Sequence, residues 1–143
     1  MKTEFSAEKI MSLHVQIAPP YDTGTNEDGH LRVIPITGGT FEGENFNGKI
    51  IPGGADWNTE IGDGYTHVLA HYCIQENDGT LISVENEGYI NFDQDSVART
   101  VPRFTTDFSN GKYGIFRTGV FIGTLDATHS DDGRIEIVIY KLD

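Results

Sequence analysis

Hydrophobic and polar residues alternate along most of this chain. Residues 12–17 read SLHVQI and residues 134–140 read RIEIVIY. A period of two predicts β-strands with one buried face. Further strands are expected near residues 31–37, 40–43, 46–52, 65–75, 81–91, 103–108 and 113–124. One short helix is expected over Phe92–Thr100, where Asp93 or Asp95 would cap the first turn and Pro102 would end it.

Short turn sequences separate these predicted strands. The segments EDG at 27–29, NDG at 77–79, NG at 110–111 and DDG at 131–133 supply residues that tolerate positive φ. About eight to ten strands must form a sandwich or close on themselves, because one open sheet would expose an apolar face and two edges. The succession of hairpins favours a single all-β domain over residues 1–143, an antiparallel up-and-down barrel.

The net charge of the chain limits the kinds of partner it is expected to bind. The formal net charge is −12, and no cluster of Lys and Arg interrupts it. Such a surface repels phosphate backbones and anionic lipids, so neither nucleic acid nor a membrane is expected as a partner. The lone Cys73 cannot form an internal disulfide, and neither a signal peptide nor a run of about 20 apolar residues is evident. A cytoplasmic location is therefore expected.

One segment resembles a phosphate-binding loop. Residues Gly43–Lys49 fit the first seven positions of G-x-x-x-x-G-K, but Ile50 stands where Ser or Thr would hold magnesium. The following IIPGG would break a helix where one must begin. The pattern favours a hairpin turn at Gly43-Glu44-Asn45 over nucleotide binding.

Two glycine pairs flank that hairpin. Gly38-Gly39 and Gly53-Gly54 are expected to bend or bulge barrel strands, which would redirect the side chains that follow them. A period of two places Thr40 and Glu42 on one face and Phe41 on the other. We expect the bends to turn Glu42 and the Asp56-Trp57 pair toward a common interior.

Several motifs together resemble the Domain of Unknown Function 3237 family. They are GGTFEG at 38–43 with Arg32 before it, PGGADW at 52–57, NDGTLISVENEG at 77–88, RTVPRFTT at 99–106 and VFIG at 120–123. The resemblance implies a lipocalin-like antiparallel barrel and brings no agreed biochemical activity. This chain has His71 where relatives often have arginine and Arg117 where they often have asparagine, which implies a different ligand or none.

Inward residues of a closed barrel converge on one cavity, so distant positions can share a site. Asp56 and Glu42 are the candidate catalytic carboxylates, since an apolar pocket beside a tryptophan would raise a carboxyl pKa. The aromatic candidates would stack on a ligand, and an arginine would bind a carboxylate or enolate oxygen. The candidate ligand-binding residues are Arg32, Thr40, Trp57, His71, Tyr72, Arg99, Phe116 and Arg117.

No metal or other cofactor is expected. His67 and His71 would share an ion on a helix, but on a strand they lie about 13 Å apart. The remaining histidines are expected at the surface. The chain also lacks the EF-hand pattern and the G-x-S-x-G motif of a nucleophilic serine.

Three functions remain open at this point. The leading hypothesis is a barrel that binds an apolar or aromatic small molecule, with or without an anionic group. The second is a cofactor-independent isomerase, cyclase or hydrolase that uses a buried carboxylate as acid and base. The third is a structural or interaction module whose barrel is filled, for instance by Arg32 or Arg99 paired with Glu42 or Asp56. A homodimer formed through an outer sheet face is also expected.

Overall fold

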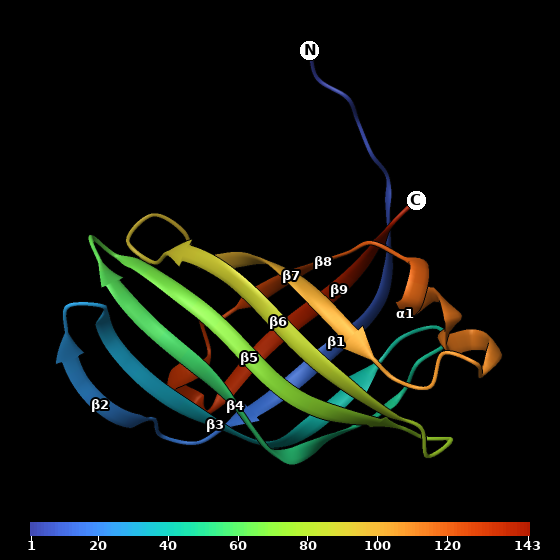
Figure 1. Cartoon of the computed structure of the whole chain (residues 1–143), viewed down its shortest axis with the longest axis horizontal. Helices are drawn as coiled ribbons and strands as arrows, with labels where there is room; N and C mark the ends of the chain where they lie inside the picture. Colours follow the sequence, from blue (N-terminus) through green and yellow to red (C-terminus); the bar gives the residue numbers. More distant parts are fainter.

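The computed structural model describes all 143 residues, and its regular secondary structure is mainly β-sheet. Its strands are β1 (Ala7–Ile17), β2 (Tyr21–Asn26), β3 (Gly29–Glu42), β4 (Gly48–Gly62), β5 (Tyr65–Glu76), β6 (Leu81–Asn91), β7 (Val97–Thr105), β8 (Phe121–Asp126) and β9 (Arg134–Leu142). Neighbouring strands are antiparallel, and pairing of β1 with both β9 and β3 closes the barrel. Eight strands form the wall, and β2 is an extra strand beside β3 (Figure 1). The predicted antiparallel barrel is confirmed.

Both glycine pairs lie where the strand register shifts. The β3–β4 register shifts between Ile36 and Thr40, and the β4–β5 register shifts between Ile51 and Ala55. Gly38, Gly39 and Gly53 have φ values of 150°, 130° and 114°, which an L side chain rarely adopts. These are the predicted bends.

The segment that resembled a phosphate loop is the turn between β3 and β4. Thr40 pairs with Lys49 and Phe41 with Gly48, so residues 43–47 connect two antiparallel strands. No helix follows Lys49, which is exposed in β4. The hairpin interpretation is confirmed.

Several segments differ from the predicted elements, among them β2, for which no strand was predicted, and β7, which begins six residues before the strand expected at 103–108. The prediction of a helix over Phe92–Thr100 is wrong, because residues Asn91-Phe92-Asp93-Gln94 form a turn and Val97 begins β7. A strand was expected over residues 113–124. The first part of this segment instead belongs to the 3-10 helix η1 (Gly111–Gly114) and to α1 (Ile115–Thr118). A second 3-10 helix, η2 (Ser130–Asp132), precedes β9. No helix is long and apolar enough to cross a bilayer.

Figure 1 shows α1 at one end of the barrel, and an aromatic cluster packs at this end. Its members are Phe46, Phe104, Tyr113, Phe116 and Phe121. Ring centroids of Phe104 and Phe116 are 4.7 Å apart, and those of Phe46 and Phe116 are 5.0 Å apart. All five side chains are buried, so the cluster closes this end.

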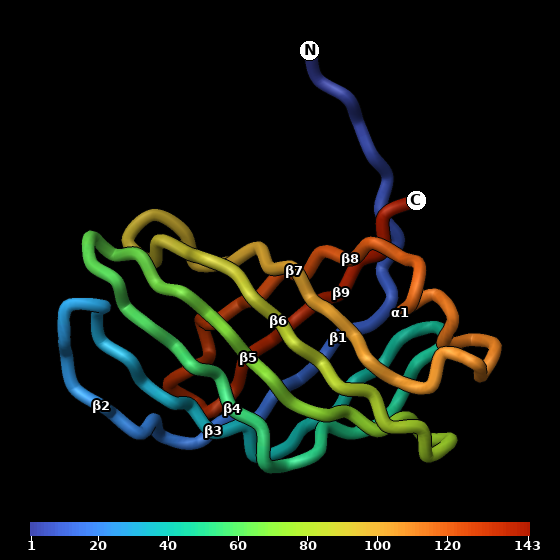
Figure 2. The backbone as a smooth tube through the Cα atoms, viewed as in Figure 1, coloured from blue at the N-terminus to red at the C-terminus, as the bar shows by residue number.

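The chain enters and leaves the barrel wall at the same place. Figure 2 shows the first residues projecting away from the barrel, past the C-terminus. The backbone N–H of Asp143 donates to the carbonyl of Ser6 over 3.1 Å. Neither terminus enters the interior of the barrel.

Candidate functional site

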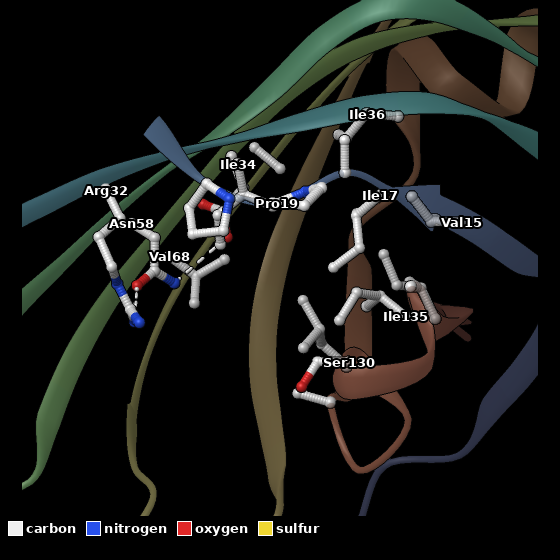
Figure 3. Close-up of a pocket in the computed structure, with 18 of the residues that line it drawn as sticks. Val15, Ile17, Pro19, Arg32, Ile34, Ile36, Asn58, Val68, Ser130 and Ile135 are labelled. Carbon is white, nitrogen blue, oxygen red and sulfur yellow. Dashed lines mark hydrogen bonds between the residues drawn. The ribbon is translucent and has the colours of Figure 1, made fainter. Parts of the chain in front are cut away.

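The interior beyond the aromatic cluster holds a cavity of about 620 Å³. Side chains of β1, β3, β4, β5, β8 and β9 line it, and 13 of the 21 lining residues are hydrophobic, so its walls are mainly apolar. Exposed residues such as Pro19, Pro20 and Ser130 contribute to the lining, so the cavity opens to solvent at this end. Figure 3 shows Arg32 and Asn58 on one side of it and Ile17 and Ile135 on the other. The barrel is therefore not filled by its own side chains.

Three polar side chains form a chain of hydrogen bonds along one wall. After the bulge at Gly53-Gly54, Asp56 and Asn58 alternate with Trp57 and face inward from β4. Asn58 Nδ2 donates to Asp56 Oδ2 over 3.3 Å, and Arg32 Nη2 donates to Asn58 Oδ1 over 3.0 Å. The amide of Asn58 thus connects a carboxyl to a guanidinium.

Asp56 is the carboxyl most affected by this environment. Burial raises its pKa above the ordinary value of 3.8. The hydrogen bonds from Asn58 and from the backbone N–H of Leu69, at 3.1 Å, act in the opposite direction. Because burial is the largest effect, the carboxyl holds its proton to a higher pH than a solvated aspartate does.

Arg32 lies nearer the opening of the cavity. Its Nη2 pairs with Glu60 Oε1 at 2.9 Å, and its side chain is 31% exposed. Its Nε is buried and makes no hydrogen bond within the protein. The salt-bridge plug considered from the sequence is absent, because Arg32 pairs with Glu60 and not with Glu42 or Asp56.

Tyr72 lines the cavity from β5, as the sequence analysis expected. Its hydroxyl is buried without a hydrogen-bond partner in the protein, and this burial raises its pKa. Gly54 makes room for it, since a Cβ on Gly54 would lie 2.4 Å from the Cβ of Tyr72. The second glycine bend therefore positions Tyr72 as well as Asp56.

Five other candidates lie on the outer face of the barrel, and their expected interior position is wrong. They are Thr40, Glu42, Trp57, His71 and Arg99. The exposed fraction is 59% for the Glu42 side chain, 50% for Trp57 and 77% for the Arg99 side chain. The apolar neighbours Phe41, Ala70 and Ala98 take the inward positions beside Glu42, His71 and Arg99, whereas Trp57 faces outward because the register after the bulge turns Asp56 and Asn58 inward.

Glu42 forms a hydrogen bond with His14 and takes no part in lining the cavity. His14 Nε2 lies 2.7 Å from Glu42 Oε1, and His14 Nδ1 hydrogen-bonds Glu136 on the other side. Glu42 belongs to β3, His14 to β1 and Glu136 to β9, so the imidazole connects two carboxylates across three strands. The hydrogen bond to Glu42 is the largest cause of a raised His14 pKa.

Phe116 and Arg117 belong to the closed end. Phe116 packs within the aromatic cluster and does not line the cavity. The guanidinium of Arg117 lies 5.4 Å from the ring centroid of Phe108. Their expected place beside a ligand in a common interior is therefore wrong, because α1 was not anticipated.

Asn58 was not predicted as a site residue. Its period-two relation to Asp56 was the available signal, but the prediction grouped Asp56 with Trp57, which lies on the opposite face of β4. As to metals, no three His, Cys, Asp or Glu side chains come together in an arrangement that could hold an ion. His67 and His71 lie on the extended β5, and each bonds a different partner, Glu87 and Ser83 respectively.

Several proteins are similar to this chain. A UPF0311 protein of Rhodopseudomonas palustris is 28% identical over 158 aligned positions, covering 99% of both chains. A UPF0311 protein of Clostridium acetobutylicum is 36% identical over 86 residues, which cover 59% of this chain and 54% of that protein. The hydroalkoxylation enzyme phnH of Penicillium herquei is 32% identical over 83 residues, or 58% of this chain and 55% of that enzyme.

Solved structures share the architecture. A protein of unknown function from C. acetobutylicum superposes with a TM-score of 0.86 at 27% identity over the whole of both chains. A beta-barrel like protein from Acinetobacter baumannii gives 0.86 at 26% identity, covering 100% of this chain and 99% of that one. The family model described as "Protein of unknown function (DUF3237)" matches residues 5–142. The chain therefore belongs to the DUF3237 family.

Proposed function

We propose that this barrel binds a mainly apolar small molecule that carries an oxygen-containing group. The observation that supports the proposal is the cavity of about 620 Å³ with apolar walls and one polar wall. Drug-sized ligands occupy cavities of roughly 300–1,000 Å³ with a few polar groups that orient them. The buried Arg32 Nε–H has no partner in the protein and can donate a hydrogen bond to a ligand oxygen. On the same wall, Asp56 can donate or accept a proton.

The neutral fluorescent probe N-phenyl-1-naphthylamine tests this proposal. Its emission should rise on binding to the wild-type protein. Ala70→Trp should abolish that rise, because Ala70 lines the cavity and is only 4% exposed. Leu69→Trp is the matched control, since its side chain lies on the opposite face of β5 and outside the cavity lining. Equal binding by the two variants would contradict a ligand in the barrel interior.

Acid–base catalysis at Asp56 is a second candidate function. It is favoured by the raised pKa of Asp56 inside an apolar cavity and by the relative called a hydroalkoxylation enzyme. Hydroalkoxylation adds an O–H group across a C=C bond. The Asp56 carboxylate would take the hydroxyl proton while the oxygen forms its bond to one carbon. The resulting carboxylic acid would return that proton to the other carbon, so no cofactor or oxidant is consumed.

The cyclisation of 2′-hydroxychalcone to flavanone is a suitable test reaction. It adds a phenolic O–H across a conjugated C=C bond, and loss of the chalcone absorbance reports it. The wild-type protein should accelerate it above the buffer rate, and Asp56→Asn should reduce the rate to that of buffer without loss of probe binding. Glu44→Gln, a change at the exposed β3–β4 turn, is the control. Full activity of Asp56→Asn would rule out this role.

A further inference from the structure

Three buried polar side chains inside the barrel have no partner in the protein. They are Tyr72 on β5, Asn86 on β6 and Thr100 on β7, with exposed fractions of 4%, 0% and 1%. The Tyr72 hydroxyl, both polar atoms of the Asn86 amide and the Thr100 hydroxyl make no hydrogen bond within the protein. We call these three residues the inner polar cluster.

The strand register places the cluster directly beside the cavity wall. Tyr72 and Ala70 line the cavity from β5, and Asn86, which pairs with Ala70, lies with Thr100 just outside the lining. Thr100 pairs with Gly88 on one side and with Gly123 on the other. All of these positions face the barrel interior on adjacent strands.

Glycine at position 123 leaves space for the polar atoms. A Cβ there would lie 2.3 Å from Thr100 Oγ1 and 3.7 Å from Asn86 Oδ1. Thr100 Oγ1 and Asn86 Oδ1 therefore lie beside the same glycine. Any side chain at position 123 would crowd the Thr100 hydroxyl.

Such a cluster is costly in an empty barrel. Each buried polar group without a partner destabilises a fold, because it gives up its hydrogen bonds to water without replacing them. Leucine, valine or phenylalanine would fill the same positions without that cost, as apolar residues do elsewhere in this core. The cost is offset if a bound molecule supplies the missing hydrogen bonds.

We propose that the inner polar cluster is a hydrogen-bonding subsite at the inner end of the cavity, which takes a neutral hydroxyl or carbonyl group of the ligand. This inference rests on the proposed binding function and specifies its ligand. The amide and the two hydroxyls can each donate and accept, so they suit a phenol, an enol or a ketone. None carries a charge, so a carboxylate would find no cation among them.

A matched pair of probes tests the subsite. 2-Naphthol and 2-methylnaphthalene differ by a hydroxyl in place of a methyl group, and their affinities can be measured by displacement of N-phenyl-1-naphthylamine. The wild-type protein should bind 2-naphthol more tightly. In Asn86→Leu/Thr100→Val the ratio of the two dissociation constants should shift toward 2-methylnaphthalene by about tenfold or more.

Single changes keep the test independent of folding. Thr100→Val and Tyr72→Phe preserve shape, and each should shift the same ratio in the same direction. Tyr113→Phe removes a buried hydroxyl that bonds Asp78 away from the cavity, so its ratio should equal that of the wild type. Circular dichroism of each variant confirms the barrel.

The outcomes separate the two proposals. If both probes bind but the ratio does not change in any cluster variant, the subsite is wrong and cavity binding stands. If neither probe binds the wild-type protein, both proposals are wrong. If 2-naphthoate binds as tightly as 2-naphthol and loses affinity in the same variants, the preference for a neutral group is wrong.

Discussion

Asn58 Nδ2 donates a hydrogen bond to Asp56 Oδ2 over 3.3 Å, from a position two residues further along the same strand. Both side chains face the cavity because β4 alternates after its bulge. The hydrogen bond favours the charged carboxylate, whereas burial favours the neutral acid. Burial is the stronger effect, so one amide moderates the proton affinity of the candidate acid–base group.

Replacement of Asn58 by leucine should raise the pKa of Asp56 further. The variant loses a hydrogen bond to the charged form and adds apolar surface beside it. Carbon-13 NMR titration of the Asp56 carboxyl measures the change. Thr59→Val, on the opposite face of β4, should leave the value as in the wild type. A lower pKa in Asn58→Leu would contradict this account of the site.

Asp56 should also make the stability of the barrel depend on pH. Its folded-state pKa lies above the unfolded value of 3.8, so the folded state binds the proton more tightly. The penalty for burying the charge is absent below pH 3.8 and grows as pH rises to the folded-state pKa. Across this interval the wild type should therefore lose stability that Asp56→Asn keeps. The free energy of unfolding of the variant, measured in urea, should rise relative to that of the wild type. A constant difference would contradict the assignment.

His14 should also make stability fall as pH rises, but over a higher pH interval than Asp56. Its pKa is raised chiefly by the hydrogen bond with Glu42, so its charged form stabilises the fold. This contribution is fully present below pH 6.5 and is lost as pH rises through the raised value. Because the side chain is 43% exposed, the loss should stay below about 1 kcal/mol. Urea unfolding at pH 6 and pH 9 should show it in the wild type and not in His14→Gln, and 1 M NaCl should diminish it.

The two glycine bends should differ in their tolerance of alanine. Gly39 and Gly53 both have positive φ, but a Cβ on Gly39 would lie 2.0 Å from the carbonyl oxygen of His14, whereas Gly53 has open space around it. Gly53→Ala should cost about 1–2 kcal/mol from backbone strain. Gly39→Ala should cost more, by about 1–3 kcal/mol, because the backbone must also shift. Equal losses in urea unfolding would show that the close approach is unimportant.

Truncation of the aromatic cluster should affect stability and not binding. Phe116→Ala should lower the free energy of unfolding by about 3–5 kcal/mol, because Phe116 packs against three other phenylalanine rings. Its affinity for N-phenyl-1-naphthylamine should match that of the wild type at a temperature where both are folded. A large loss of affinity would indicate that the two ends of the interior are linked.

The glycine bends could be predicted from the sequence, but the direction of the side chains beside them could not. Period two correctly separated Phe41 from Thr40 and Glu42. The face that points inward is decided by burial, and the apolar Phe41 takes it. Preference for the chemically interesting carboxylate over the apolar neighbour led to the wrong face.

The same reasoning explains Trp57 and the helical segment. A large aromatic residue suggests a buried position. The bulge in β4, however, sets the alternation so that Asp56 faces inward and Trp57 is half exposed. Residues 111–118 form two helical segments of four residues each, too short to show a helical period. The exposed strand β2 has no buried face and so leaves no alternation to detect.

The closed aromatic end means that any molecule must enter and leave the cavity by the same route. Association and dissociation then share one transition state at the opening near Pro19 and Ser130. A bulky change there that does not touch the bound molecule alters both rate constants by the same factor. Their ratio, and with it the equilibrium affinity, stays constant, so crowding of this opening changes how long a ligand stays and not how much is bound.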